Sequence, residues 1–141
     1  MSNFSKKVTG SLMDGIAPGM AELQRAVRLQ QQAASAGFDW AAPGPVVDKL
    51  REEIAELLAA MASGEAGRIE DELGDLMFAV TNLARHLQVD PVTALRRANA
   101  KFEQRFRALE QLAGSRERLH DMALDEMEAL WQQVKRAGSS V

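Results

Sequence analysis

The feature that most constrains this fold is a pair of apolar stripes at helical spacing, separated only by the short segment SGEAG at residues 63–67. Apolar side chains recur with the period of an α-helix in residues 46–62 and again in residues 68–87. The stripe residues are Val47, Leu50, Ile54, Leu57, Leu58 and Met61 before the turn, and Ile69, Leu73, Leu76, Val80, Leu83 and Leu87 after it. Because the connecting segment is short, the two helices are expected to run antiparallel.

The remaining sequence predicts three more helices, at residues 17–37, 89–114 and 124–138, and a loop at residues 38–45. No segment has the alternation that is typical of a strand, so the predicted class is all-α, a helical bundle built on the antiparallel hairpin. A chain of 141 residues suits one domain. We expect a mobile tail at residues 1–16 and a single domain at residues 17–138.

Composition excludes several other classes of protein. The net charge of −3 argues against a dedicated nucleic-acid binder. Cysteine is absent, so the chain has neither a disulfide framework nor a thiolate metal site. The longest apolar run, LLAAMA, is too short to span a membrane, and the N-terminal segment has no apolar signal core. We therefore expect a cytoplasmic protein that binds neither membranes nor nucleic acid.

Two acidic pairs with the same i,i+3 spacing lie on the two helices of the hairpin. They are Glu53 with Glu56, and Glu72 with Asp75. Glu56 and Glu72 are each roughly 8–10 Å of helix from the turn, so the four carboxylates can meet across the hairpin. Such clustering is costly unless a cation balances it, and a hard cation such as Mg²⁺ prefers carboxylate and phosphate oxygens. The alternative is a solvated acidic surface with pairs such as Lys49–Glu53.

Several polar side chains fit nucleotide binding, although each also has a purely structural explanation. Lys101 and Arg105 lie i,i+4 on one helix and can hold a polyphosphate by charge-assisted hydrogen bonds, or simply form a solvated basic face. Asn82 follows the second acidic pair on the same strip of its helix. Its amide can bind a sugar hydroxyl or a base edge, or it can link two helices.

The aromatic side chains also leave two alternatives open. Phe38 and Trp40 flank Asp39 in the predicted loop, where they can stack on a base or close the end of the bundle. Trp131 lies i,i+4 from Lys135. Its spacing alone favours packing in the core.

The acidic residues also carry a resemblance to a known family. EEIAE at residues 52–56, followed by fifteen residues and then ELGD at residues 72–75, resembles the EExxE…ExxD signature of MazG-type nucleoside triphosphate pyrophosphohydrolases. GFDW, KFEQRF and EMEALWQQVK match the same family in order, so the resemblance covers about residues 15–136. It implies a helical bundle that dimerises, and Mg²⁺-dependent hydrolysis of ribo- or deoxyribonucleoside triphosphates to the monophosphate and pyrophosphate, which removes unwanted nucleotides from the pool.

The resemblance also implies roles for individual residues. The expected ligands of one or more Mg²⁺ ions, for which Mn²⁺ can substitute, are Glu53, Glu56, Glu72 and Asp75. Glu52 is expected to bind a second metal ion or to act as the base that activates water. Lys101 and Arg105 are expected at the phosphates, and the element with Trp131 and Lys135 is expected to close over the nucleotide. The alternatives are a dUTPase- or dCTPase-like enzyme of the same superfamily, or a non-catalytic helical oligomerisation module.

Overall fold

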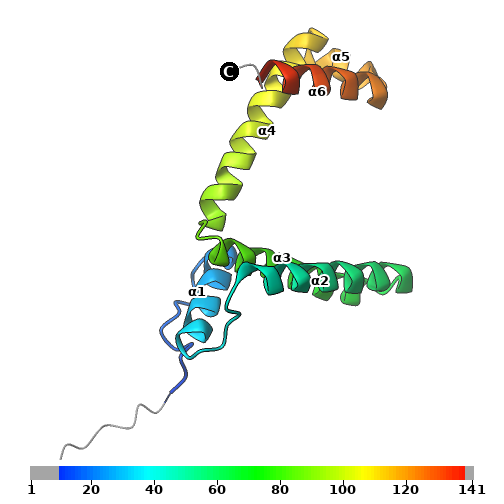
Figure 1. Ribbon diagram of the computed structural model, residues 1–141. Coiled ribbons are helices and arrows are strands. Elements are labelled where there is room, and N and C mark those ends of the chain that lie inside the picture. Colours follow the sequence, from blue (N-terminus) through cyan, green and yellow to red (C-terminus); the bar gives the residue numbers. More distant parts are fainter. Residues whose placement is uncertain (1–9, 139–141) are drawn as a thin grey trace, which may run out of the picture. The chain divides into compact units, whose positions relative to one another are not determined.

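The computed structural model describes residues 10–138 and contains six helices and no strand within that range (Figure 1). The all-α prediction is therefore confirmed. The chain divides into two compact units, Met1–Val92 and Thr93–Val141. Of the tail predicted at residues 1–16, residues 1–9 lie outside the described residues, while the chain makes turns just before Ile16, which is buried.

The first unit is built from three helices that bring distant parts of the sequence together. These are α1 (Glu22–Ser35), α2 (Pro43–Ser63) and α3 (Ala66–His86). Helices α2 and α3 lie side by side, joined at Gly64, whose φ of 71° is readily adopted by glycine (Figure 1). Helix α1 packs on α3, where Gln30 Nε2 donates hydrogen bonds to Phe78 O (2.9 Å) and to Thr81 Oγ1 (3.1 Å).

The second unit has its own small core. It contains most of α4 (Pro91–Ala113), together with α5 (Arg116–Asp121) and α6 (Leu124–Gly138). The core residues are Leu109, Ala113, Leu119 and Val134. Trp131 packs against this core, and its ring lies 5.4 Å from that of Phe102 between centroids. Trp131 therefore packs within this unit.

The starts of two helices differ from those expected from the sequence, and one short helix is additional. Helix α2 begins at Pro43 rather than within the segment that follows the loop, because the first turn of a helix needs no N–H donor from proline. Helix α1 begins at Glu22, and the residues after Pro18 form a turn instead. Helix α5 was not predicted; Ser115 caps it by accepting a hydrogen bond from the Arg118 N–H (3.2 Å).

Much of the apolar surface of α2 and α3 is open in a single copy of the chain. The exposed apolar side chains on these helices are Ile54, Leu58, Met61, Leu73, Met77, Phe78 and Val80. The pairing of α2 with α3 therefore buries only part of the stripes that the sequence predicts. Within residues 10–138, no helix has the length and apolar character needed to cross a membrane.

Candidate active site

Three of the four predicted metal ligands come together between α2 and α3. Glu53, Glu56 and Glu72 each offer a carboxylate oxygen, and these atoms lie within 4.8 Å of one another. We call these three residues the acidic cluster. Glu53 and Glu56 lie one turn apart on α2, and α3 supplies Glu72 from the facing helix. Asp75 is exposed and does not belong to this group, although it lies close enough to influence Glu72.

The acidic cluster contains two buried oxygens that lack partners among the described residues. They are Glu53 Oε2 and Glu72 Oε2. Glu53 is only 6% exposed, which is unusual for a carboxylate without full compensation. Its other oxygen, Oε1, is 3.0 Å from Lys49 Nζ. The Lys49–Glu53 ion pair that was expected for a solvated acidic surface therefore exists. It uses only one carboxylate oxygen of Glu53 and leaves the other without a partner.

The charges in the acidic cluster are not balanced within it. Burial raises the pKa of Glu72 above its ordinary value, and so do a side-chain hydrogen bond with Glu56 and the negative charges of Glu56, Asp75 and Glu53. A divalent cation would remove this repulsion and occupy the two unpartnered oxygens, and three clustered carboxylates are a suitable ligand set for a hard cation. The residues present thus fit Mg²⁺.

A small cavity connects the acidic side chains with the predicted nucleotide-binding residues. It has a volume of about 160 Å³. Its polar lining residues are Glu53, Asp75, Lys49 and Asn82, and its apolar lining residues are Trp40, Val46, Phe78 and Ala79. Asn82 is 7% exposed, so its amide belongs to the interior of this region. The structure thereby brings two predicted metal ligands beside two predicted nucleotide-binding residues.

A larger cavity of about 480 Å³, which we call the aromatic cavity, shares lining residues with the small one. Both are lined by Trp40, Phe78 and Asn82, and the larger cavity is also lined by Phe38, whose side chain is 83% exposed, and by Gln30. Its other lining residues are Met13, Leu29, Ala33, Gly37, Asp39 and Arg85. Aromatic and apolar walls with a few polar groups suit a nucleobase.

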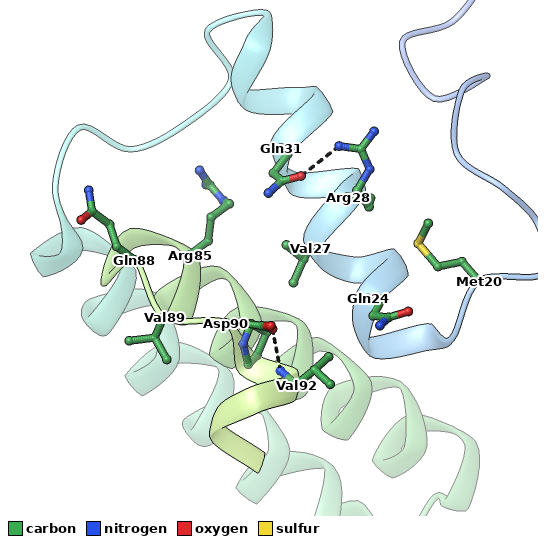
Figure 2. Close-up of a pocket in the computed structure, with 11 residues that line it drawn as sticks. Met20, Gln24, Val27, Arg28, Gln31, Arg85, Gln88, Val89, Asp90 and Val92 are labelled. Carbon is green, nitrogen blue, oxygen red and sulfur yellow. Dashed lines mark hydrogen bonds between the residues drawn. The ribbon is translucent and has the colours of Figure 1, made fainter. Parts of the chain in front are cut away.

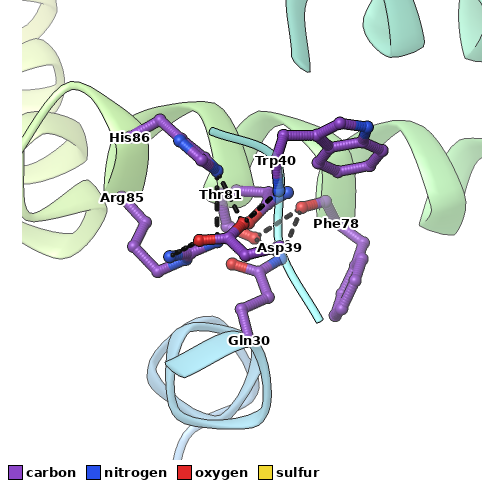
Figure 3. A network of polar contacts seen from close by, with 8 residues as sticks. Gln30, Asp39, Trp40, Phe78, Thr81, Arg85 and His86 are labelled. Carbon is purple, nitrogen blue, oxygen red and sulfur yellow. Dashed lines mark hydrogen bonds and ion pairs between the residues drawn. The ribbon is translucent and has the colours of Figure 1, made fainter. Parts of the chain in front are cut away.

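A network of polar contacts surrounds Asp39 at the edge of this cavity (Figure 3). Arg85 donates to both carboxylate oxygens of Asp39, from Nη1 to Oδ2 (2.9 Å) and from Nη2 to Oδ1 (2.6 Å). His86 Nε2 lies 2.8 Å from Asp39 Oδ1, and Arg85 also donates to Asn82 Oδ1 from Nε (3.2 Å) and Nη2 (2.8 Å). We call Asp39, Asn82, Arg85 and His86 the Asp39 cluster.

The Asp39 cluster is electrostatically satisfied. Hydrogen bonds from Arg85, followed by those from His86, lower the pKa of Asp39 to about 2. Sequence reasoning gave no role to Arg85 or His86. The available signal was a charged residue between two aromatic residues in a loop, together with a basic pair in the last turn of a helix, but nothing in the sequence connects the two.

The other predicted residues have separate surroundings. Glu52 on α2 is exposed, with Oε2 3.6 Å from Lys49 Nζ. Lys101 and Arg105 lie on the part of α4 that belongs to the second unit, as do Trp131 and Lys135 on α6. Lys101 is exposed and Arg105 is partly buried.

A further cavity of about 500 Å³ lies between α1 and the start of α4 (Figure 2). None of the predicted site residues lines it. Figure 2 shows Arg28 hydrogen-bonded to Gln31, and the Val92 N–H donating to Asp90 Oδ1, which caps the start of α4; both distances are 3.0 Å. The acidic cluster and the aromatic cavity therefore remain the candidate site.

The fold and the site define an all-helical protein with clustered carboxylates that fit a divalent cation beside an aromatic cavity. The sequence pattern of the MazG nucleotide pyrophosphohydrolase domain matches residues 44–109. This segment includes the whole acidic cluster as well as Asp75 and Asn82.

Similar proteins agree with this match. The chain is 44% identical over 135 residues to a nucleoside triphosphate pyrophosphohydrolase of Escherichia coli (strain K12), an alignment that covers 94% of this chain and 51% of that protein. It is 37% identical over 130 residues to the nucleoside triphosphate pyrophosphohydrolase/pyrophosphatase MazG of Thermotoga maritima, covering 92% of this chain and 50% of that protein. The chain belongs to the MazG family. It spans about half the length of these two relatives.

Proposed function

We propose that this chain is a Mg²⁺-dependent nucleoside triphosphate pyrophosphohydrolase. It would add water across the α–β phosphoanhydride and release a nucleoside monophosphate and pyrophosphate, thereby removing unwanted ribo- or deoxyribonucleotides from the cellular pool. The observation that carries the proposal is the acidic cluster, which has two unpartnered carboxylate oxygens and whose Glu53 lines a small cavity together with Trp40 and Asn82. Membership of the MazG family supports the reaction type.

The acidic cluster and Asp75 are the proposed ligands of one or more Mg²⁺ ions, and Mn²⁺ is a possible substitute. When bound, Mg²⁺ neutralises phosphate charge and lowers the pKa of coordinated water. Glu52 is the proposed base that accepts a proton from the attacking water, or else a ligand of a second metal ion. Its exposed carboxylate is adjacent in sequence to Glu53 and on the same helix.

The proposed nucleoside site is the aromatic cavity. Phe38 and Trp40 would stack against the base, and Asn82 would bind a polar edge of the base or sugar. The proximity of all three to one cavity supports this assignment. The cavity shared by Trp40, Asn82, Glu53 and Asp75 gives a short path from the base to the metal ligands.

Three basic side chains are the proposed phosphate-binding groups. Lys101 and Arg105, with Lys135, would neutralise the triphosphate as its anhydride bond breaks, and Trp131 would close over the nucleotide. The exposed apolar side chains of α2 and α3 support a second copy of the chain as the element that completes a bundle around this antiparallel hairpin. The proposed assembly is therefore a homodimer.

The test is a product assay on the purified full chain with each common ribo- and deoxyribonucleoside triphosphate and Mg²⁺, with pyrophosphate and orthophosphate measured separately. Pyrophosphate with monophosphate is expected, and it should be absent with Glu72→Gln but retained with the matched control Glu70→Gln, an exposed glutamate on the same helix. Orthophosphate with diphosphate would contradict the cleavage position. Turnover of dUTP or dCTP alone would favour the narrower superfamily enzyme.

Absence of both turnover and Mg²⁺ binding in a folded protein would instead favour a non-catalytic helical oligomerisation module. Mass measurement in solution by light scattering tests the homodimer separately. A monomer at assay concentrations would contradict that part of the proposal while leaving the acidic cluster intact.

A further inference from the structure

The loop GFDW, residues 37–40, carries an aspartate between two aromatic residues, and this aspartate is paired with side chains on α3. Phe38 and Trp40 are exposed aromatic side chains at the mouth of the larger cavity, and Asp39 lies between them. Exposed aromatic residues in a loop lose conformational freedom when they bind a ligand, so a device that fixes the loop beforehand improves binding. Asp39 is bound from α3 by side chains that are 46 and 47 residues further along the chain.

Arg85 forms hydrogen bonds with two residues at once, Asp39 in the loop and Asn82 on α3. The Arg85 guanidinium binds both oxygens of Asp39 (Figure 3). It also binds Asn82 Oδ1, so it joins the GFDW loop to a predicted nucleotide-binding residue. The side chain of Arg85 is 17% exposed and that of His86 is 8% exposed, whereas that of Asp39 is 24% exposed, so the two donors are better shielded from water than the carboxylate that they bind. A bidentate arginine–carboxylate pair fixes direction as well as distance.

The same contacts determine which group of the Asn82 amide, the oxygen or the NH₂, remains available to bind a ligand. Its Oδ1 accepts two hydrogen bonds from Arg85, from Nε and Nη2. Rotating the amide by half a turn would place its NH₂ group against arginine donors, so this orientation is excluded. Asn82 is therefore held with Nδ2 as the group left to donate to a ligand, to an acceptor on the base or the sugar.

We infer that Arg85 is a positioning residue for the nucleoside, which holds the GFDW loop through Asp39 and orients the Asn82 amide through Oδ1, with His86 as a second donor to Asp39. This inference rests on the proposed function, because it assigns the aromatic cavity to the nucleoside. Arg85 does not contact the metal ligands in this arrangement. Its loss should weaken substrate binding without changing the chemical step.

The experiment compares Asp39→Asn and Arg85→Lys in the full chain with the same two changes at a matched pair, Asp48→Asn and Arg51→Lys. Asp48 and Arg51 form an exposed ion pair at 3.3 Å on α2. The substrate is the triphosphate that the wild type hydrolyses fastest, with Mg²⁺. Each cluster variant should raise KM by roughly tenfold with kcat changed by less than about twofold, the pattern expected when binding common to ground and transition states is lost. The control variants should leave both constants unchanged.

Two further measurements separate positioning from general stability. The double variant Asp39→Asn/Arg85→Lys should have a KM close to that of the more severe single variant, because both changes break the same contact. Acrylamide quenching of Trp40 fluorescence, measured in a Trp131→Phe background, should increase in the cluster variants before any substrate is added. A reduced kcat at unchanged KM, or unchanged KM and quenching, would overturn the inference. An Arg85→Lys protein that does not fold leaves Asp39→Asn to decide.

Failure of the proposed function is distinguishable from failure of this inference. If the wild type hydrolyses no triphosphate, the proposed function is wrong, and Trp40 quenching alone then tests whether Arg85 holds the loop. If the wild type is active and Trp40 is equally accessible with and without the Asp39 carboxylate, the function stands and the positioning role is wrong.

Discussion

The acidic cluster and the Asp39 cluster both place carboxylates against α3, and they differ in what balances the charge. Arg85 and His86 surround Asp39, and its pKa is lowered to about 2. Around Glu72 the nearest charges are other carboxylates, and its pKa is raised. One cluster is complete as folded, whereas the other gains from a cation that the chain does not itself supply.

This difference separates the carboxylates that stabilise the fold from the carboxylates that remain available to bind a ligand. A charge that is fully paired within the protein contributes to folding and positioning. Buried carboxylate oxygens without partners cost free energy unless something outside the chain binds them. The following predictions test this contrast, beginning with the largest expected effect.

Replacing a ligand in the acidic cluster should remove activity, whereas replacing a carboxylate outside it should not. Glu72→Gln should lower pyrophosphate release by at least about 100-fold, since the amide cannot supply the charge that a hard cation requires. Calorimetric titration with Mg²⁺ should show the loss of binding. Near-normal Mg²⁺ affinity in this variant would contradict the role of the acidic cluster.

Mg²⁺ should stabilise the wild type by mass action. A ligand that binds only the folded state adds about 2.7 kcal/mol to the free energy of unfolding at a concentration of 100 times its Kd. Thermal unfolding with Mg²⁺ and again with EDTA measures this difference. Glu72→Gln should show little of it, and Asp39→Asn should retain it in full.

In the metal-free protein, removing a carboxylate charge should have opposite effects on stability in the two clusters. Asp39→Asn removes half of a bidentate pair and should lower the free energy of unfolding by about 1 kcal/mol. Glu72→Gln relieves repulsion and should raise the unfolding temperature measured in EDTA. Destabilisation of the metal-free protein by Glu72→Gln would show that Glu72 is paired for structural reasons.

The smallest effect is expected in the pH dependence of stability. The pKa of Asp39 is lower in the folded state than its ordinary value of 3.8, so its contribution is present above about pH 4 and is lost as pH falls towards about 2. The raised pKa of Glu72 has the opposite sign: the folded state binds this proton more tightly, so stability without metal falls as pH rises above 4.5 through the raised value.

Urea unfolding in EDTA across this pH range tests both signs. The gap between wild type and Asp39→Asn should narrow below pH 4, and the gap between wild type and Glu72→Gln should narrow as pH falls towards 4.5. Mg²⁺ affinity should fall over the same interval as Glu72 takes up its proton. If the free energy of unfolding varied with pH in the same way for all three proteins, the proposed difference between the two clusters would be wrong.

Local periodicity in the sequence was sufficient to predict the helical class and the i,i+3 spacing that places each acidic pair on one side of its helix. A period of 3.6 residues fixes which side chains share a face, and the short connection at Gly64 fixes how α2 and α3 face each other. The start of α2 at Pro43 and the short helix Arg116–Asp121 were missed because a proline-rich start and a six-residue helix carry little periodic signal.

Which charged residues form ion pairs within the protein, and which remain available to a ligand, depends on the packing of the helices. Glu52 and Glu53 are adjacent in sequence, yet only Glu53 is buried, because it faces α3. Asp39 meets Arg85 because the loop before α2 returns to the end of α3, a contact between residues far apart in the chain. Charge pairing depends on distances in space, and those arise only when the helices have packed.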